Sequence, residues 1–161
     1  MVRFTREQYI DAHPQEVWKV LGDYSNVYRW APIVKASRQT STEATGVGAA
    51  RACSVPGFGE VTETVDRWDE GRGFSYRWAA SGPMKGGRSS WTVSRKGTGT
   101  LVQADIEAEP GYGILGKLLV PVFKPMMIRM ISDALRGLEH HVETGQVVDA
   151  AVAKKLGLKA A

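Results

Sequence analysis

A change of hydrophobic period near Pro110 divides the sequence into two parts. From Ile33 to Glu109, apolar and polar residues alternate, and turn-forming pairs such as Pro56-Gly57 and Gly82-Pro83 interrupt the alternation. This pattern predicts a meander of about six antiparallel strands. After Pro110, apolar residues recur at spacings of three and four as far as Val142, which predicts one long amphipathic helix.

The residues before this meander predict one strand and two short helices. The strand covers Arg3 to Ala12, and Pro14 then stands in the first turn of a helix that ends at Gly22-Asp23. A second short helical piece carries Tyr24 to Trp30. The expected fold is therefore α+β, with about seven strands in one sheet and a long C-terminal helix.

The boundaries of the long helix define the expected domain. Because Pro121 and Pro125 cannot donate backbone hydrogen bonds, we expect the regular helix to begin near one of them and to end at Gly145. Residues 1–145 then form a single domain. Residues 146–161 are rich in Ala and Lys and lack aromatic residues, so we expect a flexible tail.

Composition excludes several classes of protein. A chain of 161 residues can bury a substantial core, and its single cysteine, Cys53, cannot form an internal disulfide. The formal net charge is +4, but the basic residues are scattered, which argues against a nucleic-acid partner. The charged N-terminus and the interrupted apolar stretches indicate a cytoplasmic protein without a membrane span. Contact with an acidic membrane surface stays possible, although no sequence feature supports it.

Several segments together resemble the START-like, or SRPBCC, superfamily, which includes bacterial polyketide cyclase/dehydrase-like proteins, the birch pollen allergen family and the plant abscisic acid receptors. The segments that carry the resemblance are Ala12–Trp18, Leu21–Tyr24, Arg29–Pro32, Gly46–Arg51, Val61–Val65, Trp68–Gly71 and Phe74–Trp78, followed by the long helix. The resemblance implies a helix-grip fold, in which a curved antiparallel sheet wraps the long C-terminal helix and leaves a cavity between them. It also implies that the two short helices close one end of the sheet, where Trp18 and Trp30 would lie.

A set of large apolar residues, together with one acidic residue, forms the candidate wall of this cavity. Aromatic side chains can stack on a flat apolar ligand, and methionines can adapt around it. Taken one at a time, these residues are more typical of an ordinary core, but the resemblance favours a shared cavity for the set. The candidate ligand-binding residues are Trp30, Ile33, Phe58, Glu63, Tyr76, Trp78, Met84, Trp91, Phe123, Met126, Met127 and Met130.

Two of these candidates, Phe58 and Met84, stand at loop tips. The loops correspond in position to the gate and latch loops of the abscisic acid receptors, although neither has the full receptor consensus. Hormone sensing is therefore not implied, but apolar residues at these tips fit a cavity entrance.

Glu63 is the most informative polar residue because its place in the alternation puts a carboxylate on the apolar face of a strand. Abscisic acid receptors carry a Glu on the matching strand that faces the pocket. The alternative is a structural ion pair with Arg51, Arg67 or Arg88. If the protein is an enzyme, Glu63 and Tyr76 are the candidate catalytic residues, for acid and base chemistry.

Other catalytic constellations have little support. The histidines are His13, His140 and His141, all outside the predicted cavity centre, so no base for a nucleophile is expected there. Cys53 has no clustered ligands around it in the sequence, so we expect no metal site. No segment fits a phosphate-binding motif, and we expect no cofactor.

Three functions remain open. The first is binding or transport of a small hydrophobic ligand, such as a polyketide, a lipid, a sterol or a quinone-like molecule. The second is a polyketide cyclase or dehydratase reaction in the same cavity, which would make the protein a lyase or an isomerase. The third is an interaction module for a membrane-linked or quinone-linked partner, which a conspicuous surface patch would favour.

Overall fold

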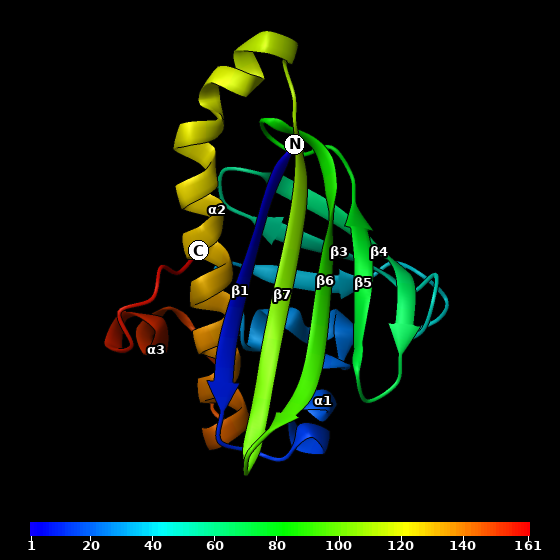
Figure 1. The fold of residues 1–161 in the computed structure, drawn as a ribbon, viewed down its shortest axis with the longest axis vertical. Coiled ribbons are helices and arrows are strands. Elements are labelled where there is room, and N and C mark those ends of the chain that lie inside the picture. The colour runs from blue at the N-terminus through cyan, green and yellow to red at the C-terminus, as the bar shows by residue number, and fades with distance from the viewer.

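The computed structural model describes residues 1–161, apart from the side chain of Lys117. Its elements form one antiparallel sheet with a long helix packed against β1 and β7 (Figure 1). The strands are β1 (Val2–Ile10), β2 (Ala36–Gln39), β3 (Ala50–Val55), β4 (Gly59–Asp69), β5 (Gly73–Trp78), β6 (Met84–Lys96) and β7 (Gly99–Pro110). The helices are α1 (Pro14–Leu21), η1 (Tyr24–Arg29), α2 (Gly113–Thr144) and α3 (Ala150–Lys155).

The sheet has seven strands in the order β1-β7-β6-β5-β4-β3-β2. Every neighbouring pair is antiparallel, so the meander follows the chain and only β1 joins from outside, beside β7. The main core lies between this sheet, the short helices and α2. The predicted α+β architecture, with two short helices after the first strand, is confirmed.

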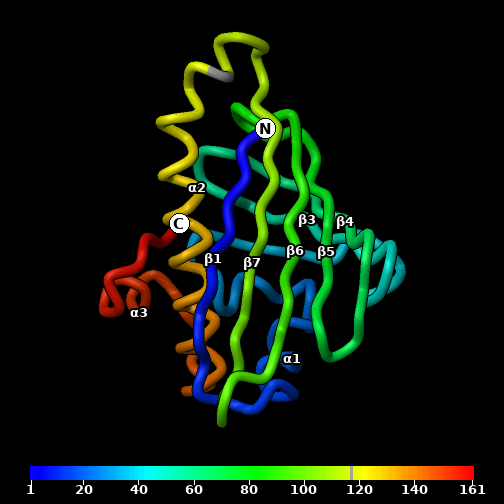
Figure 2. Tube along the Cα trace, in the orientation of Figure 1, coloured from blue at the N-terminus to red at the C-terminus, as the bar shows by residue number. Residues whose placement is uncertain are grey.

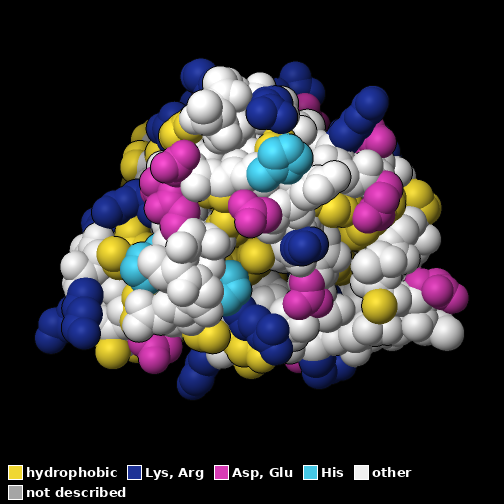
Figure 3. Space-filling model, turned by 90° about the horizontal axis from the view of Figure 1, so that it is seen from below, with side chains coloured by type: hydrophobic (Ala, Val, Ile, Leu, Met, Phe, Trp, Pro, Cys, Tyr) yellow, Lys and Arg dark blue, Asp and Glu magenta, His cyan; other side chains and the backbone are white. Residues whose placement is uncertain are grey.

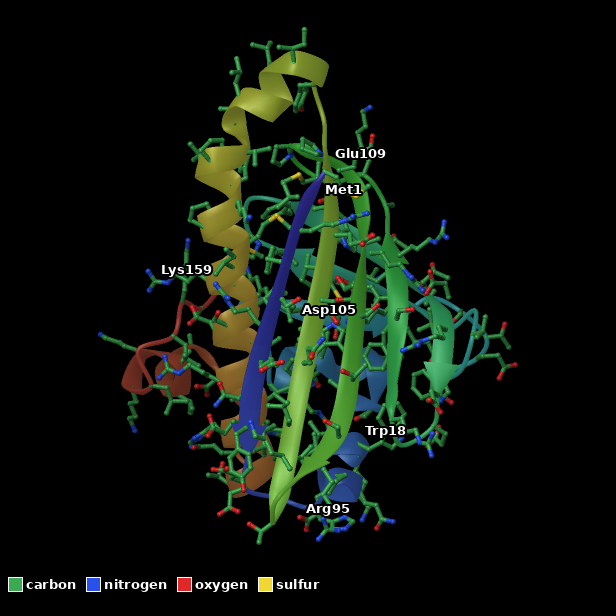
Figure 4. All side chains as sticks on the ribbon, in the orientation of Figure 1. Met1, Trp18, Arg95, Asp105, Glu109 and Lys159 are labelled. Atoms are coloured by element: carbon green, nitrogen blue, oxygen red, sulfur yellow. The ribbon has the colours of Figure 1, made fainter. Side chains whose placement is uncertain are left out.

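Local sequence explains the first short helix. His13 and Glu16 form a capping box, because each side chain accepts a hydrogen bond from the backbone at the start of α1, and Pro14 follows at the first helical position. The buried face of α1 carries Trp18, whose ring meets Trp68 edge-on at 5.2 Å between centroids. This contact lets α1 cover the lower end of the sheet, where Figure 4 labels Trp18.

The long helix begins earlier than the sequence predicted. It starts at Gly113, so Pro121 and Pro125 lie inside it, and the expected start at one of these prolines is wrong. Each proline removes only one backbone donor, and the neighbouring residues continue the helix around the gap. The first turns of α2 bend toward β7 and extend beyond the end of the sheet (Figure 1).

The last residues of the chain pack against the domain, which differs from the loose tail expected from the sequence. Residues 146–161 include α3, and the chain then runs back beside α2 (Figure 2). The Val148 amide donates to the Arg29 carbonyl at 2.8 Å, and the Ala161 amide donates to the Pro32 carbonyl at 2.9 Å. Val148, Val152, Ala153 and Leu158 form a small buried cluster. Their apolar burial gives this segment a physical reason to dock.

None of the helices in the described part of the chain is both long enough and apolar enough to cross a lipid bilayer.

Candidate ligand cavity

Two adjoining cavities lie between the sheet and α2. Each has a volume of about 110 Å³. They share the side chains of Val55, Glu63, Tyr76, Met130 and Ile131, so these residues form the boundary between the two spaces. The first cavity extends toward the β3–β4 turn, and the second extends toward η1 and the residues that follow it.

Most of the predicted wall residues lie at these cavities. Those at the first cavity are Phe58, Glu63, Tyr76, Trp78, Met127 and Met130. Those that line only the second are Trp30, Ile33 and Trp91.

Three predicted wall residues line neither cavity. Met84 and Phe123 belong to a separate apolar cluster at the upper end of the molecule, together with Val2 and Ala108. Met126 lies one position before Met127, and a single step along a helix rotates a side chain by about 100°. Its direction therefore differs from that of Met127, which does face the first cavity.

The sequence analysis missed small residues that make room in the wall. Ser89 lies beneath the first cavity and shares its strand face with Trp91, two positions later on β6. Cys53 lines the second cavity from β3. The signal for these residues in the sequence is a small side chain on a strand face that is otherwise aromatic. A small residue there leaves space that its neighbours do not fill.

Gly137 is a further residue that the sequence analysis missed, and it positions one wall of the second cavity. A Cβ at this point of α2 would lie 2.0 Å from the carbonyl oxygen of Trp30. Only glycine allows the helix backbone and the backbone of Trp30 to approach this closely. The indole of Trp30 is thereby held against α2.

Glu63 forms an ion pair with Arg51, which was one of the three partners considered from the sequence. The β3–β4 register places these residues opposite each other, and Arg51 Nε lies 2.6 Å from a Glu63 carboxylate oxygen. The side chains are only 5% and 14% exposed, respectively. Arg88, in contrast, pairs with Asp66. The Glu63 charge at the cavity is therefore compensated by a buried cation.

The same guanidinium ties η1 to the sheet. Arg51 donates a hydrogen bond to the Tyr24 carbonyl, and its charged carbon lies 4.0 Å from the centre of the Tyr24 ring. The ring of Tyr76 lies 5.2 Å away on the cavity side. A buried Arg that is both paired and placed over aromatic rings loses much less on desolvation than an isolated one.

Tyr76 and Cys53 both stay protonated near neutral pH. Burial raises the pKa of the Tyr76 phenol, and the neighbouring Glu63 carboxylate raises it further. Burial likewise raises the pKa of Cys53 to about 12, with a further contribution from Glu63. Tyr76 therefore keeps its proton and is a poor candidate for a general base.

Two indole N–H groups at the second cavity lie within hydrogen-bonding distance of no acceptor among the described residues, although the Trp91 indole lies near enough to the Tyr76 hydroxyl to lower the pKa of that phenol. They belong to Trp30 and Trp91, both of which are buried, and their rings meet at an angle of 70° with centroids 5.7 Å apart. A buried donor without an acceptor carries an uncompensated desolvation cost, so such groups are rare in folded proteins. The site therefore combines a mainly apolar wall with two buried donors, which an acceptor could reach only if the surrounding side chains move.

Comparison with known proteins places the chain in a family. Residues 1–143 match the family model described as "Polyketide cyclase / dehydrase and lipid transport". The chain belongs to this family. The resemblance to START-like proteins that was seen in the sequence is thereby confirmed, and no curated protein matches the chain closely enough to add a more specific activity.

Solved structures show that the helix-grip fold is shared with proteins of low sequence identity. A START superfamily protein from Mycobacterium smegmatis is 14% identical, with a TM-score of 0.72 over 89% of this chain and 99% of that one. A protein from Thermus thermophilus is 20% identical, with a TM-score of 0.74 over 89% and 99%. The XoxI protein from Bacillus cereus is 19% identical, with a TM-score of 0.72 over 89% and 97%. Family and fold together favour a hydrophobic ligand.

Proposed function

We propose that this family member binds a small, flat, mainly apolar molecule that carries a hydrogen-bond acceptor, such as a ketone or quinone oxygen. The observation that carries the proposal is the pair of unpartnered indole N–H groups of Trp30 and Trp91 on a mainly apolar wall, which also includes the Arg51–Glu63 ion pair. An acceptor placed beside them would satisfy donors that the protein leaves open.

The volume of the two cavities limits the size of the ligand that they can hold. An engineered cavity of about 150 Å³ in another protein holds one benzene molecule. Each cavity here is about 110 Å³, so one alone is too small for a ring system, and the two together suit one or two fused rings. A sterol or a long acyl chain would require α2 to move away from the sheet. The size therefore favours small carbonyl compounds over larger lipids.

The expected entrance lies at the β3–β4 and β5–β6 loops. Phe58 lines the first cavity from one loop, and the Ser81 hydroxyl from the other loop donates to the Phe58 carbonyl. Exchange of a ligand would need these loops to separate, which would break the Ser81–Phe58 hydrogen bond and move the Phe58 side chain.

A cyclase or dehydratase reaction in the same cavity has weaker support. Such a reaction needs a group that can accept a proton, but Glu63 is held in an ion pair by Arg51 and burial keeps Tyr76 protonated. Turnover of a carbonyl substrate that is lost in Glu63→Gln would favour the enzyme over the binding protein.

Trp91→Phe should weaken binding of 1-tetralone about two- to twelvefold, because one hydrogen bond contributes about 0.5–1.5 kcal/mol. Binding of tetralin, which lacks only the carbonyl oxygen, should change little, since phenylalanine retains the aromatic wall. Both ligands can be titrated against tryptophan emission. Trp68→Phe is the matched control, because Trp68 stacks on Phe74 and donates to Glu70 away from the cavities. Equal losses for both ligands, or no saturable binding by the wild type, would contradict the proposal.

Trp78→Ala should weaken both ligands alike, by roughly two- to tenfold, because it removes an aromatic wall of the first cavity rather than a donor. Trp68→Ala should have the smaller effect on affinity. The reverse order of the two variants in the same titration would place the ligand outside the first cavity.

A further inference from the structure

The first turns of α2 expose a run of large apolar side chains, which we call the apolar tip and define as Tyr112, Ile114, Leu115, Leu118, Leu119 and Val122. Ile114 is 78% exposed and Leu118 is 69% exposed. These turns extend past the end of the sheet, and they are the uppermost part of the molecule in Figure 1. A cluster of exposed apolar residues of this size on one element marks a contact surface.

The apolar side chains of the tip lie on a face of α2 that is turned away from the core. Ile114, Leu118 and Val122 follow one another at four-residue spacing and so share one face of α2. Phe123 and Met127 lie on a different face, toward the apolar cluster inside the domain. The exposed face is therefore a second apolar stripe that the fold does not bury.

The charges around the tip have one sign. Residues 110–128 include Lys117 and Lys124 but no Asp or Glu, whereas Arg129, further along α2, pairs with Asp133 at 3.7 Å. The first turn of α2 also contains no acidic residue, so the partial positive charge of the helix N-terminus is not neutralised within that turn. Below the tip, Glu109 is paired with Lys85 at 3.5 Å. The apolar tip is thus combined with basic charge.

The opposite end of the molecule looks different. Seen from below, acidic and basic side chains are interspersed there, and the hydrophobic side chains do not gather into one projecting patch (Figure 3). In Figure 4, Met1 and Glu109 lie at the upper end, just beneath the tip. The lower face therefore lacks the combination of projecting apolar residues and basic charge that the tip has.

We propose that the apolar tip docks on a lipid bilayer that contains anionic lipids. Basic, amphipathic helical segments bind such surfaces by burying apolar side chains about 5–10 Å deep while their Lys and Arg residues meet acidic headgroups. A second copy of the chain fits less well, because two tips would bring like charges together. A bilayer also accepts a convex projection without needing a groove of matching shape.

Docking in this way turns the expected cavity entrance toward the bilayer. Phe58 at the β3–β4 turn packs in the same upper cluster as Phe123 and Met127 of α2. An apolar ligand could then exchange between bilayer and cavity over a short path. The docking itself needs no ligand and is independent of the proposed binding function.

The experiment is co-sedimentation of the full chain with phosphatidylcholine vesicles, either pure or containing about 30% phosphatidylglycerol. We expect binding to the anionic vesicles that weakens as salt is raised. The double variant Ile114→Ser/Leu118→Ser should lower the partition coefficient at least tenfold. Both positions are exposed, so its thermal melt should match the wild type. Val47→Ser is the matched control, because Val47 is an exposed valine far from the tip in sequence and should leave partitioning unchanged.

Equal partitioning of the wild type and the double variant would overturn the proposal, as would equal binding to neutral and anionic vesicles. A concentration-dependent dimer that only the double variant abolishes, without vesicle binding, would assign the tip to a second copy instead. Titration of the double variant with 1-tetralone keeps the two proposals separate. Unchanged ligand affinity with lost vesicle binding supports docking, whatever the outcome for the cavity.

Discussion

Replacing Arg51 by methionine is expected to lower the free energy of unfolding by about 3–5 kcal/mol, the usual cost of removing one partner from a buried ion pair. The Glu63 carboxylate would be left without its cation, next to Cys53 and the ring of Tyr76. The Tyr24 carbonyl would also lose its donor, which weakens the attachment of η1 to the sheet. Urea denaturation measures this loss directly.

Two further variants test whether the stability loss comes from the unpaired buried charge: a control at an exposed arginine, and a double variant that removes both charges of the pair. Arg67→Met changes an exposed arginine on β4 and should alter the free energy of unfolding by no more than about 0.5 kcal/mol. In the double variant Arg51→Met/Glu63→Leu neither charge of this buried pair remains, so much of the lost stability should return. A loss below about 1 kcal/mol in Arg51→Met would mean that the pair does not organise this part of the core.

Removing residues 146–161 is expected to lower the free energy of unfolding by about 2–4 kcal/mol. Burial of a Val or Leu side chain contributes about 1.5–3 kcal/mol, and the entropy of ordering the segment offsets part of the sum over Val148, Val152 and Leu158. The deletion also removes the donor to the Arg29 carbonyl and the contact between Lys159 N–H and Asp133. Thermal and urea melts of the shortened chain measure the change.

A neighbouring pair of point variants gives the matched control. Val148→Ala should cost about 1–2 kcal/mol, because Val148 is fully buried, whereas Val147→Ala should cost little because its side chain is exposed. An unchanged melt for the shortened chain would mean that the segment is a loose tail after all.

The strands could be predicted from the sequence because each buries one face, which produces an alternation of apolar and polar residues along the strand. The alternation from Ile33 to Glu109 predicts that residues two positions apart share a strand face, and Tyr76 and Trp78 of β5 do line the same cavity. The resemblance to START-like proteins supplied what alternation cannot, namely that these faces surround a cavity beneath a long helix.

The errors have physical causes. Pro121 and Pro125 look like helix starts, but a helix tolerates a missing donor where its flanking turns still bond. The sequence contains one indication that the last segment docks, namely the four-residue spacing of the apolar residues Val148, Val152 and Leu156. A pattern that covers so few turns is weak evidence for a packed helix.

The ion-pair partner of Glu63 could not be predicted from the sequence. Arg51, Arg67 and Arg88 were all plausible partners from the sequence, and the choice among them depends on the register between β3 and β4. Register is a tertiary property, since sliding a strand by one residue moves every side chain to the other face. The sequence could not predict that the N–H groups of Trp30 and Trp91 lack partners. Whether a donor has an acceptor nearby depends on the tertiary structure.

The most direct test of the binding role is the set of five indole N–H signals in a ¹H–¹⁵N correlation spectrum, one for each tryptophan of the chain. Single Trp→Phe variants assign them. On titration with 1-tetralone, the Trp30 and Trp91 signals should shift downfield and saturate together, because their N–H groups gain an acceptor. The signals of Trp18 and Trp68, which already donate to Glu70, should stay in place. If the Trp30 and Trp91 signals do not move while the ligand is shown to bind, the ligand does not occupy the cavity between the sheet and α2 in the way proposed.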